Sequence, residues 1–86
     1  MPEISRFFGI VIKMYFNDHM PAHFHAEYGE HVAELTIETL EVIRGYLPNR
    51  VLGLVLEWAV LHRQELRNNW ELARAKETLI AIEPLE

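Results

Sequence analysis

The sequence predicts an α+β protein of two layers: a mostly antiparallel, four-stranded sheet in meander order, covered on one face by a C-terminal helix or a broken helix pair. Apolar residues recur with period two between about residues 5 and 45, and with helical spacing from residue 49. Short turns separate the alternating runs, which favours antiparallel neighbours. The 86 residues, half of them apolar, are expected to form a single domain over residues 1–86.

The first predicted strand is the longest alternating run, RFFGIVIKMYF over residues 6–16. Alternation places one set of side chains toward the helical layer: Phe8, Ile10, Ile12, Met14 and Phe16. Lys13 and Tyr15 fall on the opposite, uncovered face. A turn over residues 17–22 follows, because Asn17 and Asp18 favour turns and Pro21 excludes a helix.

The remaining strands are shorter. HFHAEY, residues 23–28, places Phe24, Ala26 and Tyr28 on one face, with His23, His25 and Glu27 on the other. After a turn at Gly29, VAELTIE directs Ala33, Leu35 and Ile37 inward and Glu34 outward. EVIRGY supplies a fourth strand that ends at Gly45. The uncovered face of the sheet should therefore carry His23 and His25 side by side.

The helical region is expected over residues about 49–76, beginning at Pro48 or Asn49. Its apolar stripe comprises Val51, Leu54, Val55, Trp58, Leu61, His62, Leu66 and Ala73. The first half is apolar on nearly all sides and the second is amphipathic, so a break is expected between His62 and Gln64. Residues 78–86 form an extended tail. The apolar start of the helix also suggests a partner surface or a homodimer.

Composition limits the chemistry. The chain has no cysteine, so a metal would have to be held by histidine, aspartate, glutamate or water. Its net charge of −5 is unlike the basic excess of a free-standing nucleic-acid binder, so any RNA contact would have to be local. We see no leader sequence and no apolar run near 18 residues, which predicts a cytoplasmic protein without a membrane contact.

The segment NDHMPAHFHAEYGE holds three of the five histidines. Side chains at i and i+2 of a strand share a face, so His23 and His25 can converge on one ion, with His19 as a third ligand and Asp18 or Glu27 as a fourth. Three protein ligands and an open position are typical of catalytic zinc sites. Another divalent transition metal is an alternative.

Two other interpretations stay open. In a metal-free ribonuclease, His23 and His25, with His19 beside them, would act as acid and base; Lys13 (or Arg6 or Arg44) would supply the cation and Tyr15 a stacking platform. Alternatively, the histidines are exposed and uncoordinated, and the protein is a non-enzymatic module that binds a partner.

Several motifs give the chain a specific resemblance. They are Met1–Ile4, Gly9–Ile12, Asp18–His25 (DHMPAHFH), Tyr28–Glu30, Gly45–Pro48, Glu57–His62 and Asn69–Glu71. With them the sequence resembles the bacterial and archaeal family known as domain of unknown function 4160. Ala22 stands where that family has a second proline, and Thr39-Leu40 replaces its Asp-Gly-like turn.

The resemblance implies a genetic context and little chemistry. Members of the family often look like neighbours of another short family, domain of unknown function 2442, in a toxin–antitoxin-like pair. By that association this chain would be the toxin, with a small antitoxin-like protein as its partner, and such toxins are commonly ribonucleases. This is analogy, a weaker warrant than the geometry of a site.

Overall fold

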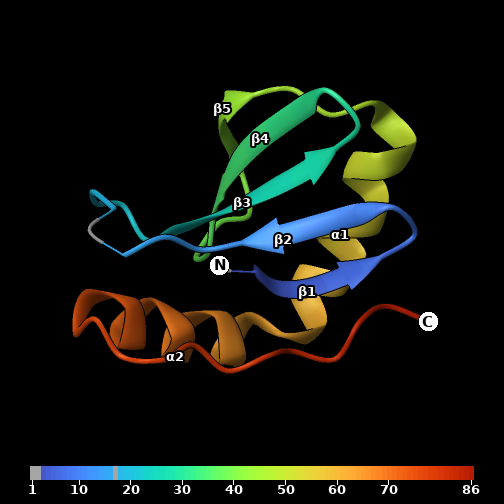
Figure 1. Ribbon diagram of the computed structural model, residues 1–86. Coiled ribbons are helices and arrows are strands. Elements are labelled where there is room, and N and C mark those ends of the chain that lie inside the picture. Colours follow the sequence, from blue (N-terminus) through green and yellow to red (C-terminus); the bar gives the residue numbers. More distant parts are fainter. Residues whose placement is uncertain (1–2, 17) are drawn as a thin grey trace.

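The computed structural model describes residues 3–16 and 18–86 and confirms the two-layer α+β fold (Figure 1). The motif residues Met1 and Pro2 and the turn residue Asn17 lie outside the described part. The elements are β1 (Glu3–Phe7), β2 (Ile10–Lys13), β3 (His23–Tyr28), β4 (His31–Thr36), β5 (Val42–Gly45), α1 (Asn49–Leu61) and α2 (Arg63–Arg74). All strand pairs are antiparallel, in the order β1-β2-β3-β4-β5. The predicted meander is correct, with five strands instead of four.

The additional strand arises because residues 6–16 do not form one strand. The chain turns at Phe8 and Gly9, whose φ angles of +50° and +78° are the pair of positive values that a type I′ hairpin loop requires. Phe7 then pairs with Ile10 across the hairpin, and both are buried. The expectation that Phe8 and Phe16 face the core is wrong, because they are 59% and 45% exposed. The turn was not predicted because apolar residues alternate through it without a break, and because phenylalanine is an unusual residue for the first position of such a loop.

β3 and β4 follow the predicted alternation, whereas every residue of β5 is exposed. Phe24 and Ala26 of β3, and Ala33 and Leu35 of β4, are fully buried. Gly29, with φ +59°, occupies the first central position of the two-residue loop between β3 and β4, where a type II′ turn needs a positive φ. Tyr28 was expected to face inward, but it lies at the end of β3 and is 37% exposed.

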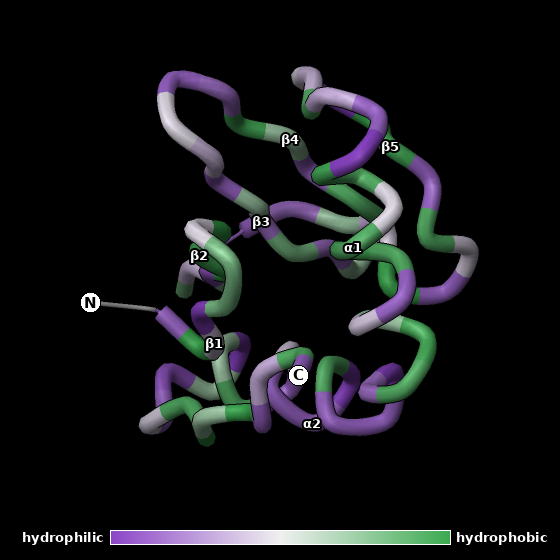
Figure 2. Tube along the Cα trace, turned by 90° about the vertical axis from the view of Figure 1, so that its right-hand side faces the viewer, coloured by the Kyte–Doolittle hydropathy of each residue, from purple (hydrophilic) through white to green (hydrophobic). Residues whose placement is uncertain are grey.

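The helical region is a pair of helices that meet at His62, as the change in amphipathicity predicted. α2 carries more hydrophilic positions than α1, and Figure 2 shows this difference along the two helices. On the apolar stripe of α1, the side chains of Val51, Val55 and Trp58 are buried. Leu61 was assigned to the same stripe but is 67% exposed, because the break at His62 ends α1 and interrupts the continuous stripe.

The tail beyond α2 is extended and is held at three points. The Ile82 backbone N–H donates to the Ile4 carbonyl of β1 at 2.7 Å, and the Trp58 indole N–H donates to the Glu83 carbonyl at 2.8 Å. The buried side-chain amide of Asn69 both donates to and accepts from the Ile80 backbone, at 2.8 Å each. The Asn-Trp-Glu motif is thus partly structural, because Asn69 satisfies backbone groups that no strand pairs.

This arrangement puts β3 in the middle of the sheet. Its inward face packs on α1, with the Phe24 and Trp58 rings 6.1 Å apart. α2 passes beside the start of β3, where its Trp70 ring lies 5.4 Å from the ring of His23. In residues 3–16 and 18–86, neither helix is long and apolar enough to cross a membrane.

Candidate metal centre

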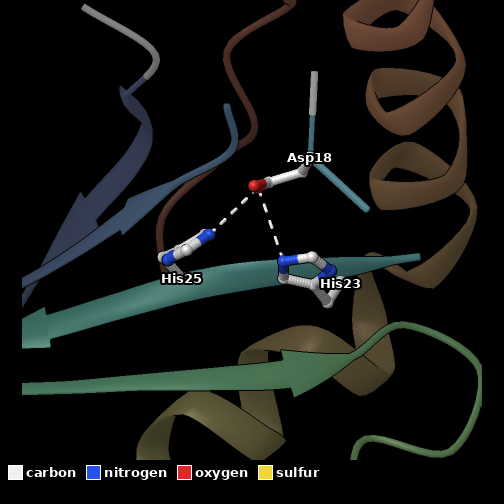
Figure 3. Close-up of side chains that lie close together, drawn as sticks. All are labelled: Asp18, His23 and His25. Carbon is white, nitrogen blue, oxygen red and sulfur yellow. Dashed lines mark hydrogen bonds and ion pairs between the residues drawn. The ribbon is translucent and has the colours of Figure 1, made fainter. Parts of the chain in front are cut away.

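His23 and His25 project from the same face of β3, as residues two apart in a strand must. Their ring centroids are 5.2 Å apart. Residues 18–22, which directly precede β3, bring Asp18 to both rings (Figure 3). Asp18 Oδ2 lies 3.1 Å from His25 Nε2 and 3.4 Å from His23 Nε2. We call these three residues the Asp18–His23–His25 cluster.

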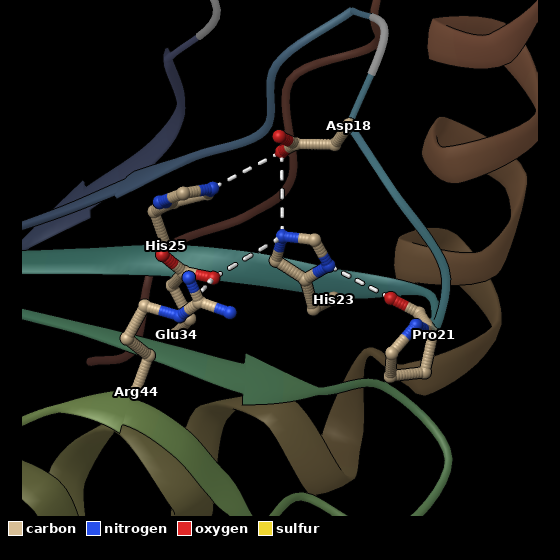
Figure 4. A network of polar contacts seen from close by, with 6 residues as sticks. All are labelled: Asp18, Pro21, His23, His25, Glu34 and Arg44. Atoms are coloured by element: carbon tan, nitrogen blue, oxygen red, sulfur yellow. Dashed lines mark hydrogen bonds and ion pairs between the residues drawn. The ribbon is translucent and has the colours of Figure 1, made fainter.

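A backbone contact fixes which nitrogen of His23 faces the cluster. His23 Nδ1 lies 2.8 Å from the Pro21 carbonyl oxygen, which can only accept, so Nδ1 carries a proton and donates it (Figure 4). In the neutral ring, Nε2 is then the atom with the free lone pair. Orientation of this kind is common for metal-ligating histidines, whose second nitrogen donates to a carbonyl or a carboxylate.

Two carboxylates face that lone pair. Besides Asp18, Glu34 Oε1 lies 3.5 Å from His23 Nε2 (Figure 4). Both distances exceed the usual 2.7–3.2 Å of an N–H···O hydrogen bond. A lone pair facing two anionic groups is repelled by them, unless the ring is protonated or a cation lies between. The arrangement therefore favours a positive charge at the centre of the Asp18–His23–His25 cluster.

The spacing of the three ligand atoms also suits a small divalent ion. Donor atoms bound at about 2.0–2.1 Å in tetrahedral geometry are roughly 3.3–3.4 Å apart. The two distances to Asp18 Oδ2, 3.1 and 3.4 Å, lie close to that value. One ligand atom from each of the three residues lies within 4.8 Å of the others. Two histidines and one carboxylate form a donor set that suits zinc and other first-row divalent metals.

The cluster is less exposed than the sequence suggested. His23 is only 5% exposed, because Trp70 of α2 and the segment around Asp18 cover it. His25 is half-buried, with the edge of its ring against Tyr15 at a centroid distance of 4.7 Å. The two rings share the predicted face of the sheet, but the expectation of openly exposed histidines was wrong. Burial lowers the local dielectric and strengthens electrostatic attraction to a cation.

The remaining predicted ligands and catalytic residues lie around the cluster and not in it. His19 is exposed and lines a small cavity beside Asp18. Lys13 and Glu27 are on the expected face of the sheet, but they pair with each other, with Nζ and Oε1 3.1 Å apart. Neither His19 nor Glu27 belongs to the set of mutually close ligand atoms among the described residues.

Glu34 was expected on the same face of the sheet as the histidines but was not among the predicted site residues. The structure puts it directly across from His25 in the β3–β4 pair. A signal for this existed: a two-residue loop at Gly29 and Glu30 fixes the hairpin register, which pairs residue 25 with residue 34. Arg44, named only as one of three cations, faces Glu34 from β5 with Nε 3.8 Å from Oε1.

The ion pair of Arg67 and Glu38 lies close to Met20 and Pro21, which precede His23. Met20 and Pro21 also line a groove of about 490 Å³ against α2, where Arg67 donates two hydrogen bonds to Glu38, at 2.7 and 2.9 Å. These hydrogen bonds lower the pKa of Glu38 and raise that of Arg67. Arg67 and Glu38 therefore form an ion pair with each other.

The fold and the cluster together define a small α+β protein in which two histidines of the central strand lie beside an aspartate from the preceding segment. The chain belongs to the family described as domain of unknown function (DUF4160), whose family model matches residues 9–71. That span contains the Asp18–His23–His25 cluster with Glu34 and Arg44. A search of curated proteins and a search of solved structures gave no match.

Proposed function

We propose that this protein binds one divalent transition metal ion, zinc being the best match, through Asp18, His23 and His25. The observation that carries the proposal is the convergence of both Nε2 atoms on one Asp18 oxygen, at 3.1 and 3.4 Å. The hydrogen bond from His23 Nδ1 to the Pro21 carbonyl supports it, because it leaves Nε2 free to ligate. An ion held by three protein ligands keeps a position for water or substrate, as in catalytic zinc sites.

Metal titration tests the proposal directly. Protein purified without a histidine tag and stripped with a chelator should take up about one equivalent of zinc in a calorimetric titration. His23→Ala and His25→Ala should each weaken binding by more than the roughly 10–100-fold that loss of an outer-shell partner costs. Circular dichroism would confirm that the variants fold.

His31→Ala is the matched control. His31 is also a strand histidine, but it is exposed on β4 and its ring contacts Tyr46, so its removal should leave zinc affinity unchanged. If wild-type protein takes up less than a tenth of an equivalent, or if the three variants bind zinc equally well, the cluster is not a metal site.

A ribonuclease toxin whose activity a small antitoxin-like protein blocks is the second candidate. The close pair of imidazoles, with Arg44 near Glu34, supports it, because RNA cleavage needs an acid, a base and a cation for the developing charge. Lys13 does not add to that cation while it pairs with Glu27. The acidic surroundings, Asp18 and Glu34, repel a phosphodiester unless a metal compensates them.

Incubation with a labelled RNA discriminates between the candidates. If the ribonuclease candidate is correct, wild-type protein should cleave the RNA, either stripped or zinc-loaded, and His25→Ala should not. If cleavage occurred only with zinc, the metal-binding site and the ribonuclease site would be the same site. Equal cleavage by wild type and His25→Ala would point to a contaminant, and no cleavage under either condition would end the ribonuclease candidate.

A further inference from the structure

A cavity of about 150 Å³ opens beside the Asp18–His23–His25 cluster. Two of the three cluster residues, Asp18 and His23, form part of its wall, so an ion bound to them would border the cavity. The other lining residues are His19, Met20, Pro21, Glu34, Ile43 and Arg44. The cavity is well below the ~300 Å³ at which pockets for whole drug-sized ligands begin. It therefore suits a compact chemical group.

Arg44 supplies a cation at this cavity, and its guanidinium is held only by a long ion pair with Glu34. The 3.8 Å from Arg44 Nε to Glu34 Oε1 exceeds the ~2.7–2.9 Å of a charge-assisted hydrogen bond. Within the described part of the chain, its side chain makes no hydrogen bond. Arg6 and Arg67, in contrast, each bond a carboxylate through two nitrogens. Arg44 is also 75% exposed, so it can turn toward an incoming ligand.

The charge of the cavity depends on whether a metal is bound. Without one, the carboxylates of Asp18 and Glu34 outweigh Arg44 and leave one net negative charge. A divalent ion reverses this to one net positive charge. Because the site is partly buried, its local dielectric constant is lower than that of water. The change in net charge therefore has a stronger effect on an anion than it would have in water. An anion would therefore be repelled from the empty site and attracted to the metal-loaded one.

We propose that the metal-loaded cavity binds a phosphate-type oxyanion between the metal and Arg44. The inference rests on the proposed metal site and adds to it the class of ligand. The planar fork of arginine matches two oxygens of one phosphate group, and such bidentate pairs are among the strongest hydrogen bonds in proteins. A free phosphate group and a phosphodiester within a longer molecule both offer two such oxygens. The compact cavity has room for the phosphate itself, so the rest of a longer molecule would lie outside it.

Cobalt is a suitable probe, because it occupies zinc-type sites and its visible absorption changes with its ligands. Cobalt-loaded wild-type protein is titrated with inorganic phosphate and, separately, with dimethyl phosphate. We expect a saturable change of the cobalt spectrum with at least one of them. Arg44→Gln should give the same spectrum before phosphate is added but bind phosphate about 10–100-fold more weakly, the loss expected for a hydrogen-bonded charged partner.

Arg50→Gln is the control, because Arg50 is also exposed but lines a different cavity, beside Phe8 and Tyr28. It should bind phosphate as wild type does. A response to dimethyl phosphate would support a phosphodiester as ligand, and a response to inorganic phosphate alone would support a terminal or free phosphate.

The two proposals fail differently. If cobalt does not bind, the metal site itself is wrong, and the oxyanion proposal is overturned with it. If cobalt binds but neither phosphate changes its spectrum, or if Arg44→Gln binds phosphate as tightly as wild type, only the oxyanion proposal is overturned.

Discussion

Saturating zinc should raise the free energy of unfolding of the wild-type protein by about 2.7 kcal/mol when free zinc is 100 times its dissociation constant. The reason is linkage: the Asp18–His23–His25 cluster exists only in the folded chain, where the turn before β3 brings Asp18 to two strand residues. The unfolded chain does not hold these three groups together. Urea denaturation with and without zinc measures the difference.

Asp18→Asn isolates the carboxylate, because asparagine keeps the shape of the side chain and removes its charge. If the substitution weakens zinc 100-fold, the same zinc concentration adds only about 0.4 kcal/mol. Asp18 lies in a turn, with its side chain 24% exposed, so the fold should tolerate the change. His31→Ala should keep the full zinc effect. Equal stabilisation of wild type and Asp18→Asn would show that zinc binds elsewhere.

Trp58→Ala should be the most destabilising single substitution that we predict, at about 3–5 kcal/mol. Trp58 is completely buried, and its ring lies 5.4 Å from that of Phe7 and 6.1 Å from that of Phe24. It also donates a hydrogen bond to the Glu83 carbonyl, which holds the tail. For a domain whose total stability is ~5–15 kcal/mol, such a loss leaves little or none.

Trp58→Phe separates the two contributions of the indole. Phenylalanine keeps most of the aromatic contact but cannot donate to Glu83, so it should cost about 1–2 kcal/mol. Urea denaturation midpoints of the two variants and the wild type measure both effects. If Trp58→Ala cost less than Trp58→Phe, the ring would not be the centre of the core.

Much of the fold was predictable because it depends on local patterns. Alternation identified β3 and β4, and the change of composition after Leu61 located the break between α1 and α2. The failure at Phe8 and Gly9 has a physical cause: the two-residue loop turns both Phe7 and Ile10 inward, whereas a continuous strand would place them on opposite faces, and the unbroken apolar run does not reveal this change. Phenylalanine is also rare at the positive φ that this loop requires.

The candidate site was predictable in part. Period two alone aligned His23 with His25, and the hairpin register would have added Glu34. No pattern indicates which of Asp18, His19 and Glu27 reaches the histidines, because that depends on the path of the turn between β2 and β3. The structure brings Asp18 to the rings, turns His19 toward solvent and pairs Glu27 with Lys13.

The sequence by itself determined that two imidazoles lie side by side on one strand, since the geometry of a strand permits no other placement of residues two apart. Only the tertiary structure decided that His23 is buried against Trp70 and that Asp18 faces its free nitrogen. Those contacts join residues from a turn, a strand and a distant helix. Their distances follow from how the layers pack, which no local pattern encodes.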